Sequence, residues 1–280
     1  MANIFSLTSH VVYGHVGGQA AVPAFQAMGH EVWHLPTVLF SNHPGHGGFG
    51  GGPVPLEQQN HLLDGLVQCG FLDECGAVHT GYLGHVGSVE VALRAIAAVE
   101  GPVLCDPVLG DDGELYVEAY LARAVRDRLL PKADLVTPNR FELGWLANRE
   151  ISNFDDAVHN AHILRQQGVD KVVCTSAAQK DGWLHNLAVD ESGVYQVRVP
   201  LVAGDAPDAV PKGTGDAFAA ILLGHFLNHG DIAAALAWAS AALHGLIKVS
   251  MATGSDELAL VEGRDQITAP DQMFEVERLS

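Results

Sequence analysis

Basic side chains are scarce in this sequence. Of its 280 residues only 15 are Lys or Arg, against 33 Asp and Glu, so the formal net charge is −18 at neutral pH. A surface of that sign repels phosphate backbones and anionic lipid headgroups. We therefore expect neither nucleic acid nor a membrane as a partner, and any phosphorylated ligand needs a local positive or dipolar pocket.

Cysteine is also rare, and its spacing excludes two common uses. The four cysteines, Cys69, Cys75, Cys105 and Cys174, form no CxxC pair and are too few for a secreted disulfide framework. The first residues lack the basic stretch of a signal peptide, so we expect a cytoplasmic protein with reduced thiols. The most apolar late stretch, residues 233–247, is too short to cross a bilayer and predicts a buried helix.

Familiar motifs of phosphoryl transfer and metal catalysis are missing as well. The sequence has no GxxxxGK[ST] P-loop and neither the HRD nor the DFG motif of protein kinases. Its 15 histidines include no HExxH pair, so a zinc site is not indicated. If this protein handles phosphate, it does so with another architecture.

Strand-like and helix-like runs alternate along the chain. Strands are predicted at residues 4–7, 32–38, 77–80, 103–108, 135–137 and 171–175, and helices at 16–28, 56–69, 88–99, 116–129, 154–167, 215–228 and 232–248. Continuous apolar strands separated by helices indicate parallel strands covered on both faces. With right-handed crossovers, the pattern predicts one α/β domain over residues 1–280. Its form is a three-layer α/β/α sandwich with a mainly parallel central sheet, which binds ligands at the carboxyl ends of its strands.

Two segments depart from that alternation. Apolar runs at residues 183–189 and 194–200 flank a DESG turn signal and predict a β-hairpin. Residues 43–53 are rich in Gly and His and predict a structureless loop, either a mobile lid or a disordered insertion. We favour a substrate-side lid, because the segment directly follows a strand that should approach the site.

The most informative motif is Lys212-Gly213-Thr214-Gly215-Asp216, followed by an apolar run that predicts a helix. Two glycines let the backbone approach an anion closely, and the positive end of the helix dipole would point at a phosphate. Asp216 falls in the first helical turn, where a carboxylate can take the proton of an attacking hydroxyl while amides hold the transferring charge. In isolation the motif also fits a Gly-rich turn whose Asp caps the helix, so its companions matter.

Acidic residues follow the strand-like runs that precede the motif. Asp106 ends one apolar run, Asp111 and Asp112 come soon after it, and Glu142 follows the next run. Carboxylates at adjacent strand ends suit Mg²⁺, which takes one or two protein oxygens together with waters and substrate phosphates. Each residue alone also fits ordinary loop charge in an acidic protein. Their convergence on one sheet edge favours metal and nucleotide handling.

Six segments, taken in order, resemble the pyridoxal kinases of the ribokinase superfamily over nearly the whole chain. They are SHVVYGHVG at 9–17, FSNH at 40–43, TGYLG at 80–84, DPVLGD at 106–111, TPNRFE at 137–142 and KGTGD at 212–216. The ordered set is specific, and its first segment is typical of the pyridoxal branch. The resemblance implies a ribokinase-like homodimer that transfers the γ-phosphoryl of ATP to the 5′-hydroxymethyl group of pyridoxal. Pyridoxine and pyridoxamine are expected as further substrates.

The resemblance also implies roles on the substrate side. Ser9 would hydrogen-bond the pyridine ring, Tyr82 would line the same pocket, and His43 would form its edge together with the Gly-rich segment. Asp216 would be the general base for the 5′-hydroxymethyl group, and the three residues before it would form the anion hole for the γ-phosphoryl group.

On the nucleotide side the resemblance implies a larger set. The ATP-binding residues implied in this way are Asp106, Asp111, Tyr116, Asn139, Glu142, Thr175, Ser176, Lys212, Gly213, Thr214 and Gly215. Asp106 and Glu142 would organise Mg²⁺ and the triphosphate, while Asp111 and Thr137 match positions used around a monovalent cation and the phosphates. Tyr116 belongs to a flap over residues 110–118 that would close over ATP, and Thr175 with Ser176 would contact the nucleotide from a strand end.

The chain departs from its relatives mainly on the substrate side. Many relatives carry Thr after Ser-Asn-His, where this chain has Pro44 and Gly45, so a threonine hydroxyl contact is missing. Residues 43–53 are also richer in Gly and His than usual. Some bacterial members carry Lys at the position of Thr175. These differences affect affinity or substrate range without removing phosphoryl transfer.

Two other functions stay open at this point. A hydroxymethylpyrimidine or sugar kinase of the same superfamily would share the GTGD motif, although the SHVVYGHVG segment argues against it. A non-catalytic pyridoxal-phosphate carrier or sensor would keep the fold without turnover. Only the Pro44-Gly45 departure supports the carrier, and the intact Asp216 and anion-hole glycines count against it.

Overall fold

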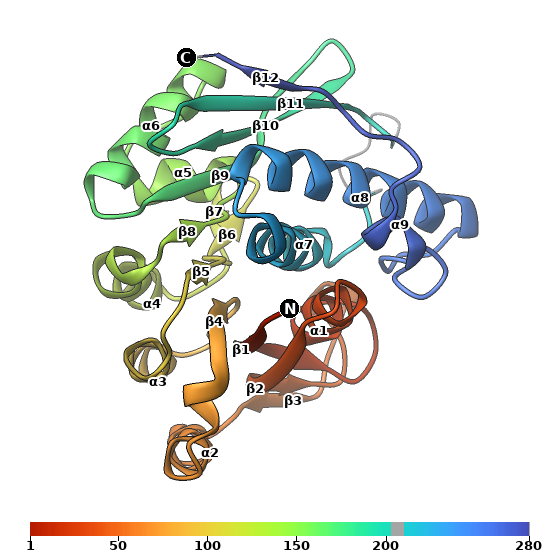
Figure 1. The fold of residues 1–280 in the computed structure, drawn as a ribbon. Helices are drawn as coiled ribbons and strands as arrows, with labels where there is room; N and C mark the ends of the chain where they lie inside the picture. Colours follow the sequence, from red (N-terminus) through yellow and green to blue (C-terminus); the bar gives the residue numbers. More distant parts are fainter. Residues whose placement is uncertain (203–209, 280) are drawn as a thin grey trace.

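A single large sheet forms the centre of the computed structural model, which describes residues 1–202 and 210–279 (Figure 1). In spatial order its strands are β12 (Val276–Arg278), β11 (Val194–Pro200), β10 (Trp183–Val189), β9 (Lys171–Lys180), β8 (Leu135–Val136), β5 (Val103–Cys105), β4 (Cys75–Thr80), β1 (Asn3–Val11), β2 (Glu31–Phe40) and β3 (Gly51–Pro53). The neighbours from β9 to β2 pair in parallel, and the strands outside them pair antiparallel. The mainly parallel sheet and the predicted hairpin of β10 and β11 are confirmed.

Helices cover both faces of this sheet (Figure 1). One face carries α1 (Gly18–Ala27), α7 (Thr214–His229), α8 (Ile232–Thr253) and the short α9 (Asp265–Thr268). The other carries α2 (Leu56–Gln68), α3 (Val86–Ala98), α4 (Ala119–Ala124), α5 (Arg140–Leu146) and α6 (Phe154–Gln166). Each face has its own apolar core, so the predicted three-layer α/β/α sandwich is confirmed.

Strand β1 explains why the parallel strands read as continuous apolar runs. Ile4 packs into the core under α1 and α7, while Phe5 and Leu7 pack into the core on the opposite face. A strand buried on both faces favours apolar side chains on both sides. The chain leaves β1 for β2 on one side and later returns to β4 on the other side. Such a switch of direction opens a crevice at the carboxyl ends of the two strands, where Ser9 and Thr80 lie.

Helix α8 is longer than the sequence suggested. It has 22 residues and is long and apolar enough to cross a membrane by length and composition alone, so the prediction that this stretch is too short was wrong. However, 61% of its most apolar window is buried inside the protein, where it packs on α7, β10 and β11. The apolar composition is accounted for by the core, and the prediction of a buried helix is confirmed.

The Gly-rich segment is not structureless, which corrects a second prediction. A single 3₁₀ turn spans Pro44–His46, and β3 adds an antiparallel edge strand to β2. Asn42 Nδ2 donates to the Gly48 carbonyl at 2.8 Å, which ties the segment to its own base. Gly51 has a φ of +98°, and a Cβ there would lie 2.0 Å from the Leu39 carbonyl oxygen, so glycine is required where the chain turns into β3.

Residues 110–115 form a hairpin in front of the helix that the sequence predicted. Strands β6 (Gly110–Asp111) and β7 (Glu114–Leu115) pair around Asp112 and Gly113, both with positive φ, as expected for a tight two-residue turn. The helix predicted from residue 116 begins only at Ala119. Asp-Gly was the signal for this turn, and the helical periodicity of the following residues obscured it.

Three histidines lie on the α1 side of the sheet close to β1. The ring of His79 contacts the Ser6 hydroxyl through Nδ1 at 3.0 Å, and His34 Nδ1 donates to the Ser6 carbonyl at 3.3 Å. His10 stacks 5.7 Å from His34. Burial lowers the pKa of His79 to about 3 and that of His34 to about 4, and the neighbouring histidine rings lower both pKa values further. Both imidazoles are therefore neutral in the folded protein at neutral pH.

These histidines predict acid sensitivity. A histidine in the unfolded chain has a pKa of about 6.5, so the unfolded state takes up protons first as the pH falls below that value. For His34, the free energy of unfolding should therefore be roughly 2 kcal/mol lower at pH 5 than above about pH 6.5. We expect His34→Gln to lose less unfolding free energy than the wild type between pH 7 and pH 5, as measured by urea denaturation. The exposed His61→Gln should keep the wild-type pH dependence, and identical losses in all three proteins would contradict this account.

Candidate active site

The N-terminus of α7 is built for close backbone approach. Helix α7 begins at Thr214, directly after Gly213, which has a φ of +88°. A Cβ on Gly213 would lie 1.7 Å from the His15 carbonyl oxygen, so no other residue fits there. Gly215 is exposed, and no atom lies within 4 Å of the place where its Cβ would be. The first turn of α7 therefore offers free amide groups to a ligand, as the motif predicted.

Asp216 lies in that first turn and is held by the segment after β1. The Gly17 backbone N–H donates to its carboxylate, and Gly17 also packs on Ser9, where a Cβ would lie 2.1 Å from Oγ. Ser9 is buried at the carboxyl end of β1. Burial raises the pKa of Asp216 to about 6, and the Gly17 hydrogen bond opposes that rise. Two residues predicted to act on one substrate molecule are thus brought together through Gly17, to which the sequence had assigned no role.

Three carboxylates share the space between α7 and the ends of β5 and β8. Asp106 follows β5, is buried, and accepts a hydrogen bond from Thr137 Oγ1 at 3.0 Å. Burial raises the pKa of Asp106 well above its ordinary value, and the negative charges of Glu142 and Asp216 raise it further. A cation placed there would relieve this repulsion. The acidic companions therefore converge on the motif, as the sequence predicted.

Glu142 joins two loops through its carboxylate. Oε1 accepts the Leu109 N–H at 2.7 Å, and Oε2 accepts the Asn139 N–H at 2.9 Å, while Asn139 Oδ1 accepts the Glu142 N–H in return. This reciprocal capping box starts α5, a helix that the sequence analysis missed. Burial raises the pKa of Glu142 to about 7 against these hydrogen bonds. A metal contact would have to use the lone pairs that remain on its oxygens.

The donor set fits Mg²⁺ better than a metal held by protein alone. Within the described residues 1–202 and 210–279, no three His, Cys, Asp or Glu side chains are arranged to hold an ion unaided. Asp106 offers a buried carboxylate beside Thr137, close enough to Asp216 in the first turn of α7 for their charges to interact. Mg²⁺ ordinarily uses one or two protein oxygens and completes its shell with water and phosphate.

Tyr82 and Tyr116 line one hollow. Its volume is about 320 Å³, and its walls are Tyr82 and Gly84 after β4 together with the residues that follow the β6–β7 hairpin. Tyr116 is 57% exposed, and its N–H donates to the Leu109 carbonyl at 3.1 Å. A residue predicted for the substrate pocket and one predicted for the ATP flap thus face the same space. Asp111 is exposed on the hairpin, whereas Thr137 lies buried beside Asp106.

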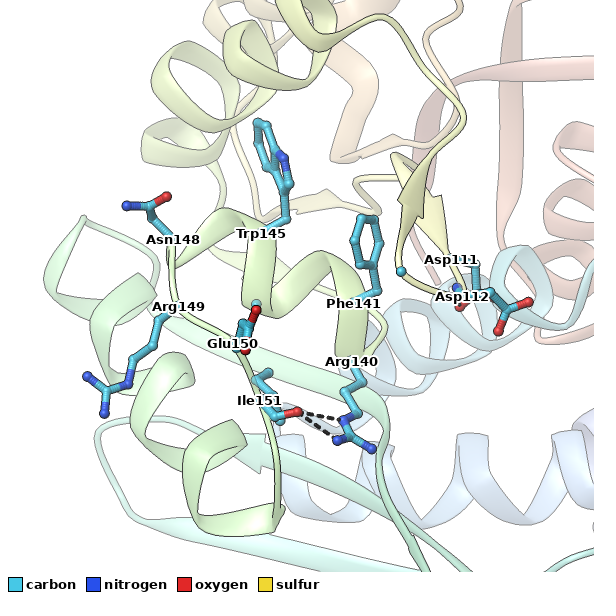
Figure 2. A pocket seen from close by; sticks show the side chains of 11 residues that line it. Asp111, Asp112, Arg140, Phe141, Trp145, Asn148, Arg149, Glu150 and Ile151 are labelled. Carbon is cyan, nitrogen blue, oxygen red and sulfur yellow. Dashed lines mark hydrogen bonds between the residues drawn. The ribbon is translucent and has the colours of Figure 1, made fainter.

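A larger hollow lies elsewhere. It has a volume of about 710 Å³ and opens on the outer side of α5, between the hairpin and residues 148–151 (Figure 2). Figure 2 shows Arg140 turned to the Ile151 carbonyl, to which it donates at 2.6 and 3.2 Å, with Phe141 and Trp145 farther along α5. Of the predicted site residues, only Asp111 borders it. Size alone therefore does not mark the reactive site in this fold.

Thr175 and Ser176 do not lie at a strand end, contrary to the prediction. Strand β9 continues to Lys180 and pairs antiparallel with β10. Only the parallel pairing of β9 with the β8 side ends at Thr175. There Thr175 pairs with Asn139, and its N–H donates to the Pro138 carbonyl at 3.1 Å. Ser176 has a φ of +52°, and its N–H donates to Asn186 Oδ1 at 3.0 Å. The irregular backbone at this position keeps both residues beside the TPN segment.

His43 and Lys212 lie close together on the substrate side. Burial lowers the pKa of His43, the charges of Lys212 and His46 lower it further, and Glu257 acts in the opposite direction. The Gly-rich segment therefore lies next to Lys212, just before α7. Glu257 is the residue that the sequence analysis missed. A single Glu after α8 carries no local signal, yet its carboxylate accepts the His15 N–H at 2.7 Å from 242 residues away.

Comparison with known proteins places this geometry in a family. The family model described as phosphomethylpyrimidine kinase matches residues 56–260. The pyridoxal kinase PdxY of Rubrobacter xylanophilus is 36% identical to this chain, over 99% of the chain and 98% of its own length. The chain belongs to the pyridoxal kinase family. A second pyridoxal kinase relative, the pyridoxine/pyridoxal/pyridoxamine kinase of Bordetella avium, is 39% identical over 95% of this chain and 91% of its own length.

A solved pyridoxal kinase structure shares the whole fold. The pyridoxal kinase from Leishmania donovani in complex with ADP and pyridoxine superposes with a TM-score of 0.92 and 31% identity, covering 99% of both chains. The same enzyme in complex with ADP gives a TM-score of 0.91 at 30% identity. The ribokinase-like fold predicted from the sequence is confirmed, and so is the resemblance to pyridoxal kinases.

Proposed function

We propose that this protein is an ATP-dependent pyridoxal kinase, which transfers the γ-phosphoryl group of ATP to the 5′-hydroxymethyl group of pyridoxal. The observation that carries the proposal is the link from Ser9 through Gly17 to Asp216 at the N-terminus of α7, in a chain of the pyridoxal kinase family. A ring held at Ser9 has its alcohol within reach of a buried carboxylate. Pyridoxine and pyridoxamine carry the same hydroxymethyl group and are proposed as further substrates.

The residues divide the reaction between them. Asp216 takes the proton of the attacking hydroxyl as the bond from oxygen to the γ-phosphorus forms and the bond to ADP breaks. The amides of residues 213–215 hold the charge on the transferring group. Asp106, supported by Thr137, with Glu142 behind it, would hold Mg²⁺, which neutralises charge on the triphosphate when bound. Closure of residues 110–118 over the nucleotide would exclude water and so prevent hydrolysis of ATP.

The acidity of Asp216 sets an expected pH profile. Its pKa is raised to about 6 by burial, and the general base must be ionised to accept a proton. We therefore expect kcat/KM for pyridoxal to be level above about pH 7 and to fall roughly tenfold per pH unit well below pH 6. Initial rates between pH 5 and pH 8.5 with saturating MgATP would measure this. A profile that stays level down to pH 5 would exclude Asp216 as the base.

Parallel assays test the function itself. ADP release should be fast with pyridoxal and much slower with hydroxymethylpyrimidine or ribose, and the product from pyridoxal should carry one added phosphate by mass spectrometry. Faster turnover of hydroxymethylpyrimidine would favour the alternative that the family model's description raises. Tight binding of pyridoxal phosphate without ADP release would favour a carrier.

Further features belong to the same proposal. We propose Mg²⁺ as the divalent ion, a monovalent cation near Asp111 and Thr137, a cytoplasmic location and a homodimer. Exposed apolar side chains around β1–β3 support the dimer, since Val12 is 81% and Tyr13 65% exposed, with Leu39 and Phe49 about half exposed. Light scattering at several protein concentrations would test it, and a monomer throughout would refute it.

A further inference from the structure

The Gly-rich segment of residues 43–53 has one anchor in the protein interior. Its 3₁₀ turn, Pro44–His46, brings the His46 ring to 6.0 Å from the Tyr13 ring and 6.2 Å from the His43 ring. His46 Nε2 then lies 3.0 Å from Glu257 Oε1. This turn contains Pro44 and Gly45, where the chain departs from its relatives.

Glu257 is buried, and its second oxygen is also engaged. The residue is 6% exposed, and Oε2 accepts the His15 N–H at 2.7 Å. Gly14 has a φ of +98°, and a Cβ there would lie 2.6 Å from Oε2, so the carboxylate packs directly on the Gly14–His15 peptide. A buried carboxylate is costly unless it is paired and hydrogen-bonded. The His46 ring and the His15 backbone N–H are its two partners.

The same carboxylate also lies beside Lys212, just before α7. The Lys212 N–H donates to the Asp256 carbonyl at 3.3 Å, and Lys212 pairs with Glu257 in an isolated parallel bridge. The His15 carbonyl in turn packs on Gly213. Glu257 thus contacts the loop after β1 and the Gly-rich segment, and it lies beside the entry to the anion hole. Most residues predicted for the nucleotide follow β5, β8 and β9, whereas Lys212–Gly215 lie on the same side as Glu257, which Lys212 meets through its backbone.

We infer that Glu257 is a positioning residue that docks the Gly-rich segment over the substrate pocket through His46. The pair sets the affinity for pyridoxal and changes the affinity for ATP much less, because His46 belongs to the segment after β2, most nucleotide residues follow β5, β8 and β9, and Lys212 meets Glu257 only through its backbone. This inference rests on the proposed function, since it assigns the pocket beside Ser9 and Asp216 to the aromatic alcohol.

Two variants separate the arms of the contact. Glu257→Gln keeps an oxygen for the His15 N–H but removes the charge that pairs with His46. His46→Ala removes only the ring of the Gly-rich segment that contacts Glu257. The His46 side chain is 29% exposed, so the protein should still fold. We expect each variant to raise the KM for pyridoxal roughly tenfold, on the scale of one lost polar contact to a charged group, with kcat and the KM for ATP changed less than about twofold.

A double-mutant cycle identifies the pair. Because both variants break one contact, the KM for pyridoxal of the double variant should not exceed that of the weaker-binding single variant. Glu262→Gln, in an exposed position of the same C-terminal segment, should match the wild type. Multiplied effects in the double variant, an equal rise in the KM for ATP, or an unchanged KM in His46→Ala would overturn the inference, the last even if Glu257→Gln fails to fold.

Binding measured without turnover keeps the two proposals distinguishable. Calorimetric titration of the wild type and His46→Ala with pyridoxal alone should give the same ratio of affinities as the KM values. A wild type that binds pyridoxal more tightly than His46→Ala but releases no ADP would refute the kinase function and leave the docking role standing. If the wild type is active but binds pyridoxal no more tightly than His46→Ala does, the docking role is refuted and the kinase function stands.

Discussion

Asp216→Asn is expected to lower kcat by a factor on the order of 10²–10⁴ while ATP binding stays largely intact. The amide side chain has nearly the same shape and can still accept the Gly17 N–H, so the first turn of α7 should keep its geometry. What is lost is a group able to take the proton of the 5′-hydroxyl. The negative charge of Asp216, which raises the pKa of Asp106, is lost as well, so the Asp106 carboxyl should ionise more readily.

Steady-state kinetics with pyridoxal and fluorescence titration with an ATP analogue would measure both effects. Asp73→Asn is a matched control, because Asp73 is exposed in the 3₁₀ turn Phe71–Glu74. Near-normal turnover in Asp216→Asn would remove the general base from the mechanism. A loss of ATP binding as large as the loss of kcat would instead mean that Asp216 acts through the phosphate site.

Gly213→Val is expected to damage both kcat and KM. The new Cβ would lie 1.7 Å from the His15 carbonyl oxygen, and Gly213 has a φ of +88°, where side chains are rarely accommodated. Either the loop after β1 or the start of α7 must move. Because displacements near 1 Å at a reacting centre cost about a hundredfold, we expect kcat/KM to fall by at least that factor for both substrates.

The matched control is Gly65→Val, in α2, where no atom lies within 4 Å of the added Cβ. Circular dichroism and a thermal unfolding curve would show whether each variant folds. A folded Gly213→Val with wild-type kinetics would mean that the backbone at this position does not approach the phosphate. The close contact of Gly213 and His15 is supported if Gly65→Val keeps wild-type kinetics and Gly213→Val does not.

Local patterns in the sequence were enough for the architecture and for the position of the central motif. The apolar runs that became β1, β2 and β4, and the glycines before the helix that became α7, are governed by neighbouring residues along the chain. Two predictions failed. The helix predicted from residue 116 starts only at Ala119, and the Gly-rich segment formed an edge strand because β2 offered unpaired backbone groups.

What the sequence by itself determined was the set of parts: a three-layer α/β fold, a helix N-terminus suited to phosphate, and acidic residues at neighbouring strand ends. Only the tertiary structure decided how they meet. Gly17 joins Ser9 to Asp216, and Glu257 reaches His15 across 242 residues. Periodicity and turn signals act over a few residues, whereas these contacts depend on the path of the whole chain through the sheet. No local pattern can encode them.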